Sequence, residues 1–143
     1  MKKLNQYSTQ VFCQILLTLG SRNHFKIYHE PYMPLSFEKL YSGIKTPWGA
    51  GTVYSLSHSF VQNGDLMRDP EICFIVVDNR EQPDDWQLIG IYPQLIQQDT
   101  MGLYKECVII EDFTVTRYHP KWQNDICNLA NLWLKNIKDQ GFL

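Results

Sequence analysis

The chain has 143 residues, of which 44% are hydrophobic and 20% charged, and its formal net charge is -2 at pH 7. The length is typical of a single domain, and the composition excludes wholesale disorder. A negative net charge argues against a protein that binds by neutralising many phosphates, so we expect no nucleic-acid partner. No segment approaches the ~20 apolar residues of a membrane span, and no continuous apolar stretch is typical of a secretion signal. We therefore expect one globular domain over residues 1–143, cytoplasmic and without a membrane contact.

The first predicted element is an amphipathic helix over residues 8–19. Val11, Ile15 and Leu19 recur at i, i+4 spacing, and Gly20 is placed to end the helix. A β-rich middle follows, in which apolar and polar residues alternate or short apolar runs are bounded by turn residues. The strand-like segments are residues 24–28, 35–38, 53–62, 65–77, 86–96, 103–110 and 113–116.

The strongest local signal is the dipeptide Asn63-Gly64 between two strand-like runs. Asn-Gly favours a two-residue hairpin turn, because both central residues need positive φ. Pro70 limits the regular pairing, since it has no N–H to donate, so the ladder must end, bulge or lie at a sheet edge there. With a two-residue turn, the expected opposite pairs are Gln62 with Asp65, Phe60 with Met67, and His58 with Asp69.

The C-terminal part is predicted to be a second helix. Pro120 suits the first helical position and Gly141 the end. Apolar residues recur at helical spacing along one stripe, namely Trp122, Ile126, Leu129, Trp133 and Ile137. The expected fold is therefore α+β: an N-terminal helix, an antiparallel sheet of about five strands, and a C-terminal helix packed on the sheet, with both helices on one face.

The cysteines show no metal or redox spacing. No CxxC pair exists, and each cysteine stands among apolar neighbours, so we expect buried free thiols at Cys13, Cys73, Cys107 and Cys127. No GxGxxG, GxxxxGK[ST], HExxH or GxSxG motif is present. We therefore expect neither a cofactor nor a metal, and we favour a non-enzymatic protein.

The candidate functional residues lie around the predicted hairpin. His58 opposite Asp69 has the composition of a general base with its orienting carboxylate, and His58 with Asp65, Asp69 or Glu71 is compatible with a metal site. A structural interpretation is favoured on residue chemistry: Asp65 and at least one of Asp69 and Glu71 would accept hydrogen bonds from backbone N–H groups of the turn. A fourth interpretation is a binding surface, made of His58, Asn63, Gly64, Asp65, Met67, Asp69 and Glu71.

Charge is concentrated next to this hairpin. Residues 63–85 contain seven acidic residues against two arginines, a net charge of -5. Asymmetry of this kind can mark a partner surface, although solvated turns produce it more often.

The decapeptide from Gln62 to Glu71 carries a family resemblance, supported by residues 31–33, 92–93, 98–104 and 133–142. It resembles an uncharacterised family, known only as a domain of unknown function, of small bacterial proteins often carried on plasmids and conjugative elements. The resemblance implies a context of mobile DNA and no particular reaction.

Three functions remain open on the sequence. We favour an accessory or protein-interaction factor linked to mobile genetic elements, whose protein partner binds residues 63–71 and the acidic segment that follows. The alternative is a metal-dependent or general-base enzyme that uses His58, Asp65, Asp69 and Glu71. The third is weak nucleic-acid binding through residues 1–62, which carry six Lys or Arg against two acids. Oligomeric state is left open.

Overall fold

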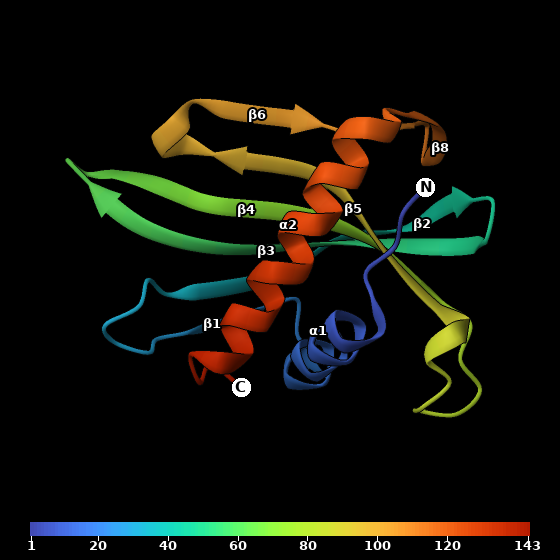
Figure 1. Ribbon diagram of the computed structural model, residues 1–143, viewed down its shortest axis with the longest axis horizontal. Helices are drawn as coiled ribbons and strands as arrows, with labels where there is room; N and C mark the ends of the chain where they lie inside the picture. Colours follow the sequence, from blue (N-terminus) through green and yellow to red (C-terminus); the bar gives the residue numbers. More distant parts are fainter.

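The computed structural model describes all residues from 1 to 143 and belongs to the α+β class. A helix stands at each end of the chain, as the sequence predicts, with the strands between them (Figure 1). The 3₁₀ turns η1 (Trp86–Leu88) and η2 (Asp99–Met101) flank β5. The helices and strands are α1 (Gln6–Leu19), β1 (His24–Ile27), β2 (Leu35–Thr46), β3 (Gly49–Gln62), β4 (Asp65–Asp78), β5 (Ile89–Gln98), β6 (Leu103–Glu106), β7 (Val108–Glu111), β8 (Thr114–Tyr118) and α2 (Pro120–Asp139).

The strands form one sheet of eight with the order β6-β5-β4-β3-β2-β8-β7, and β1 pairs with β2 off this path. All pairings are antiparallel except that of β2 with β8, which is parallel. The expected number of about five strands is therefore wrong, whereas the sheet is mostly antiparallel as predicted. Residues 103–110 are predicted as one strand from the sequence but form two strands in the fold, because β6 pairs with β5 whereas β7 pairs with β8. Periodicity alone does not reveal a change of pairing partner.

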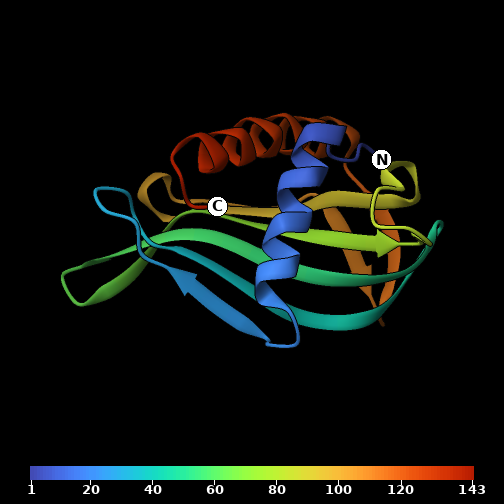
Figure 2. The ribbon, with the colours of Figure 1, turned by 90° about the horizontal axis from the view of Figure 1, so that it is seen from below.

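Both helices cover the same face of the sheet, as expected, and together they bury the main hydrophobic core of 24 residues (Figures 1 and 2). Phe12 of α1 lies at its centre and is fully buried. Its ring centroid is 5.0 Å from that of Phe74 and 5.5 Å from that of Phe37. Apolar burial of this kind is the dominant favourable contribution to folding.

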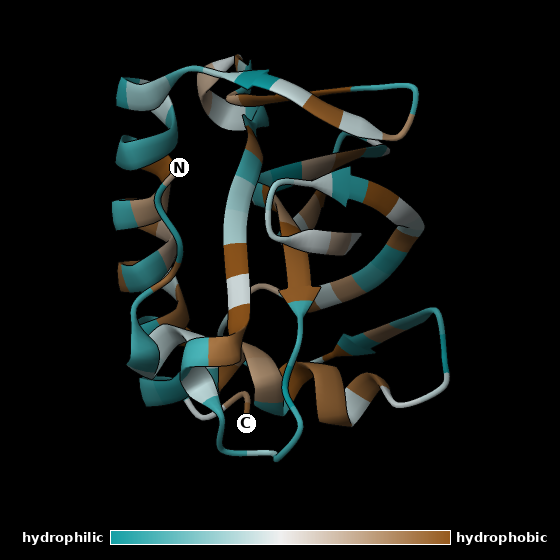
Figure 3. Cartoon of the chain, turned by 90° about the vertical axis from the view of Figure 1, so that its right-hand side faces the viewer, coloured by the Kyte–Doolittle hydropathy of each residue, from teal (hydrophilic) through white to brown (hydrophobic).

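The packing of α2 differs from the prediction along part of its stripe. Ile126 and Trp133 are buried, but Trp122 is 38% and Leu129 is 39% exposed. Trp122 instead stacks on the ring of His119, with the ring centroids 3.9 Å apart. Figure 3 shows that the outer side of α2 is hydrophilic. The apolar stripe is therefore wider than the contact that α2 makes with the sheet.

The opposite face of the sheet carries a second, smaller cluster of seven buried residues. Ile44 of β2, Val53 of β3 and Val108 of β7 belong to it, and Ile110 and Val115 pack against it. The β7–β8 pair therefore covers this part of the face. Nearer to the β3–β4 turn, the same face is polar and forms a groove.

The four cysteines are buried and free, which confirms that expectation. Burial raises the pKa of Cys73 to about 12 and that of Cys127 to about 11. Neither helix has the length and apolar character needed to cross a membrane.

Candidate functional site

The turn at Asn63-Gly64 forms as the sequence predicts. The two residues have φ angles of 53° and 84°, and they join β3 to β4 in an antiparallel hairpin. Because the turn has two residues, the expected register holds from Gln62 with Asp65 to the fourth pair along the ladder. This part of the hairpin was determined by local chemistry.

A β-bulge then changes the register at the position of Pro70. Asp69 and Pro70 together lie opposite the single residue His58, and the next pair is Ser57 with Glu71. Pro70 cannot donate to the ladder, which explains why the irregularity falls here. Side chains alternate along a strand, so one extra residue moves Glu71 to the face opposite to His58.

The seven predicted binding residues consequently do not gather on one surface. Three of them are exposed at the turn, namely Asn63, Gly64 and Asp65. Met67 and Asp69 are half-buried on the helix-facing side of β4. His58 is buried in the core, and Glu71 lies on the opposite face of the sheet. Their role in binding stays a prediction.

His58 belongs to the core beneath α2. Its Nδ1 donates to the backbone oxygen of Met33 at 3.1 Å, and its ring contacts those of Trp133 and Phe142 at centroid distances of 5.6 and 5.4 Å. Burial lowers the pKa of His58, and its backbone hydrogen bonds and, less strongly, the nearby Asp69 carboxylate oppose only part of that shift. The His58 imidazole is therefore packed beneath α2 and is 7% exposed.

The carboxylates do not shape the turn as expected. Glu71 accepts a hydrogen bond from the Ser55 hydroxyl at 2.5 Å, and its other oxygen lies 3.6 Å from Arg68 Nε. Asp65 and Asp69 accept no backbone hydrogen bond, and one buried oxygen of Asp69 has no partner. Asp99, at the start of η2, accepts from the Arg68 N–H at 2.8 Å instead. That hydrogen bond lowers the pKa of Asp99. A residue 31 positions away therefore satisfies the donor, so the structural interpretation of the turn acids was wrong.

The enzyme alternative finds no support in this geometry. No group of three His, Cys, Asp or Glu side chains is placed to hold a metal ion. His58 is covered by α2, and the bulge places Glu71 on the other face of the sheet. The four residues therefore have no common cavity.

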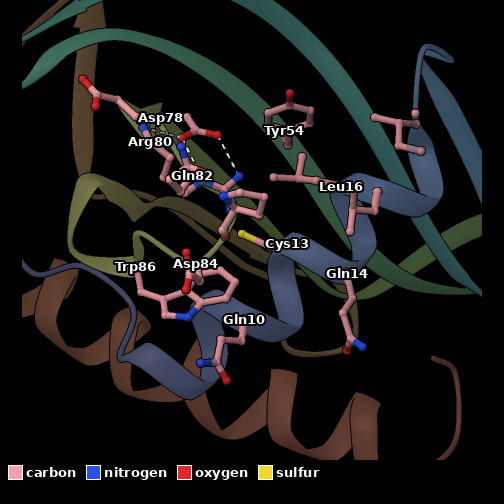
Figure 4. A pocket seen from close by; sticks show the side chains of 15 residues that line it. Gln10, Cys13, Gln14, Leu16, Tyr54, Asp78, Arg80, Gln82, Asp84 and Trp86 are labelled. Carbon is pink, nitrogen blue, oxygen red and sulfur yellow. Dashed lines mark hydrogen bonds and ion pairs between the residues drawn. The ribbon is translucent and has the colours of Figure 1, made fainter.

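A groove lies elsewhere, between α1 and the connection from β4 to β5. Its volume is about 820 Å³. Leu16, Leu17 and Leu19 of α1 line one side, and the acidic loop, residues 78–85, lines the other (Figure 4). We call this the α1 groove.

The acidic loop is anchored by one arginine. The Arg80 guanidinium donates to both carboxylate oxygens of Asp78, at 3.0 and 2.9 Å, and to the backbone oxygen of Pro83 at 3.1 Å. These bonds lower the pKa of Asp78. The guanidinium also lies 5.7 Å from the ring centroid of Trp86. Charge-assisted and bidentate bonds are the strong ones, so the loop is held in a defined conformation.

Cys13 points from α1 toward this loop in Figure 4. Burial raises the pKa of its thiol, and the nearby Arg80 guanidinium offsets only part of the rise. The thiol is therefore protonated at neutral pH and is no nucleophile.

Sequence reasoning found one half of the α1 groove. It identified the excess of acid in residues 63–85 but assigned the partner surface chiefly to the hairpin. The available signal was Leu17, an apolar residue that lies outside the apolar stripe of α1. Its side chain is 82% exposed in the structure.

Fold and grooves thus define an α+β protein whose two terminal helices cover one face of a mostly antiparallel sheet. The chain belongs to the family described as Domain of unknown function (DUF6908), whose model matches residues 10–143. No curated protein and no solved structure matches the chain.

Proposed function

We propose that the protein is a non-enzymatic binding module whose α1 groove accepts a basic segment of a protein partner. The observation that carries the proposal is the composition of this groove. The exposed Leu17 and the half-buried Leu16 of α1 face a loop with four acidic residues and one arginine, a net charge of -3 over residues 78–85.

The acids of the loop are available to a partner. Arg80 is engaged by Asp78, whereas Glu81 and Asp84 make no ion pair and no side-chain hydrogen bond. Exposed ion pairs contribute only about 0.2–1 kcal/mol each, so these acids supply orientation and association rate more than affinity.

The leucines supply the apolar part of the contact. Leu17 lines the groove and leaves most of its side chain in water. Complete burial of such a side chain contributes roughly 1.5–3 kcal/mol, which exceeds the contribution of either exposed acid. A segment with lysine or arginine beside leucine or isoleucine satisfies both sides of the groove.

The context of the partner is proposed from the sequence resemblance. Bacterial origin, a cytoplasmic location and an accessory role on plasmids or conjugative elements belong to this proposal. Residues 63–71 are retained as a second proposed contact, independent of the α1 groove.

The experiment titrates ¹⁵N-labelled protein with a synthetic peptide of alternating lysine and leucine and follows the backbone amide resonances. We expect saturable shifts in residues 10–20 and 78–86. The double variant Glu81→Gln/Asp84→Asn should weaken binding by about 2- to 30-fold, the range for two exposed ion pairs. Leu17→Ser should weaken it at unchanged charge.

The matched control is Glu111→Gln/Asp112→Asn, which removes the same charge from the β7–β8 turn outside the groove. It should leave the affinity unchanged. Equal weakening by both double variants shows nonspecific attraction to net charge and refutes the proposal, as does a peptide whose shifts fall outside the groove.

A further inference from the structure

A second groove lies on the sheet face opposite to the helices. Its volume is about 260 Å³, and it is lined by ten residues of which only one is hydrophobic. We call it the serine groove; its lining residues are His24, Lys26, Ser36, Glu38, Ser55, Ser57, Ser59, Leu66, Arg68 and Glu71.

The strand register explains the shape of the serine groove. Lys26 of β1 pairs with Ser36 of β2, Ser36 pairs with Ser57 of β3, and Ser57 pairs with Glu71 of β4. Neighbouring strands are about 4.8 Å apart, so the Lys26 and Glu71 backbones stand about 14 Å apart. The two serines between them are small, and this leaves a trough with long side chains on both sides. The β-bulge contributes directly, because it turns Glu71 to this face.

Two serine hydroxyls at the bottom of the trough have no partner. Ser57 is only 8% and Ser59 only 5% exposed, yet neither hydroxyl makes a hydrogen bond within the chain. Ser55, by contrast, donates to Glu71. Neither hydroxyl is among the fully enclosed polar atoms that lack a partner, so both are reached from the groove, where each can donate to and accept from a bound ligand.

The charges around the trough cancel. Lys26 and Arg68 oppose Glu38 and Glu71 within one small space. Glu71 is already held by Ser55 and Arg68, while Glu38 makes no ion pair or side-chain hydrogen bond. An anionic ligand would be repelled by the two carboxylates, and a cationic ligand by the two basic side chains. An apolar ligand would have only Leu66 to contact.

We propose that the serine groove binds a neutral polyhydroxylated small molecule, a saccharide or other polyol. A ligand hydroxyl both donates and accepts, so it can pair with the free serine hydroxyls, with the donors of Lys26 and Arg68, and with the carboxylate of Glu38. The groove shares no lining residue with the α1 groove, so this site stands independently of the proposed function.

The test is an NMR titration with glucose, galactose, N-acetylglucosamine and myo-inositol, each to about 50 mM, since single small sugars bind weakly. We expect saturable amide shifts with at least one of them, confined to residues 24–26, 36–38, 55–59 and 66–71. Ser57→Val removes a hydroxyl and narrows the groove, and it should weaken binding at least about tenfold. Ser42→Val, an exposed serine of β2 outside the groove, is the matched control and should change nothing.

Thermal melting of each variant verifies folding, and Ser59→Ala replaces Ser57→Val if that variant does not fold. The proposal is overturned if none of the four compounds produces saturable shifts in the groove, or if a folded Ser57→Val or Ser59→Ala protein binds as tightly as wild type. Tighter binding of glycine or inorganic phosphate at the same residues overturns the ligand class.

Discussion

Truncation of Phe12 to alanine is the most direct test of how α1 is docked on the sheet. The side chain is fully buried and its ring has aromatic neighbours at centroid distances of 5.0, 5.5 and 6.4 Å. All three fall within the range in which aromatic pairs attract each other beyond simple area burial. Core Phe→Ala changes cost about 3–5 kcal/mol, and three such pairs place Phe12 at the upper end, about 4–5 kcal/mol. For a chain of this length the melting temperature should fall by about 10–15 °C.

The assay is denaturant unfolding followed by tryptophan fluorescence and by far-ultraviolet circular dichroism. Phe12→Leu is the control and should cost less than about 1.5 kcal/mol, because it keeps most of the volume and the apolar character. A double-mutant cycle with Phe74→Leu measures the pairwise contribution of the two closest rings. A loss below about 1.5 kcal/mol for Phe12→Ala would refute the central position of α1 in the core.

Three further predictions concern titration, backbone conformation and thiol chemistry. Burial lowers the pKa of His58, so its contribution to stability is complete above the unfolded pKa of about 6.5 and is lost as the pH falls below that value. His58→Gln should therefore reduce the difference between the unfolding free energies measured at about pH 5 and pH 7.5. An unchanged difference contradicts this prediction. Gly64→Ala should lower the unfolding free energy in urea by about 1–2 kcal/mol, because alanine is strained at the Gly64 φ of 84°. Nothing lies within 4 Å of the added methyl group, so a steric clash adds nothing to this cost. A neutral result would argue against the two-residue turn. A thiol reagent such as 5,5′-dithiobis(2-nitrobenzoate) should react with none of the four cysteines of the folded protein at neutral pH and with all four after denaturation, and rapid modification of Cys73 in the native state would contradict its burial.

Local chemistry in the sequence determined several parts of this fold. Asn63-Gly64 determined the turn and the register next to it, because few residues other than Asn and Gly adopt positive φ without strain. Pro120 and the spacing from Ile126 to Ile137 determined α2, and the apolar row of residues 11–19 determined α1. Each of these signals depends on residues close together in the chain, where the backbone itself sets the geometry.

Strand partners and grooves were decided by the tertiary structure. The sequence predicted an irregularity at Pro70. Only the pairing of β4 with β3 showed that Asp69 and Pro70 together lie opposite His58 and that Glu71 therefore changes face. His58 and Glu71 would lie on the same face of a regular ladder, but the bulge places His58 in the core and Glu71 in a polar groove. Likewise, the acids of residues 78–85 become part of a groove only because their loop, braced internally by the bonds from Arg80 to Asp78, lies beside α1, about sixty residues earlier. Contacts of that separation depend on which elements bury one another's apolar faces, and no local pattern specifies that choice.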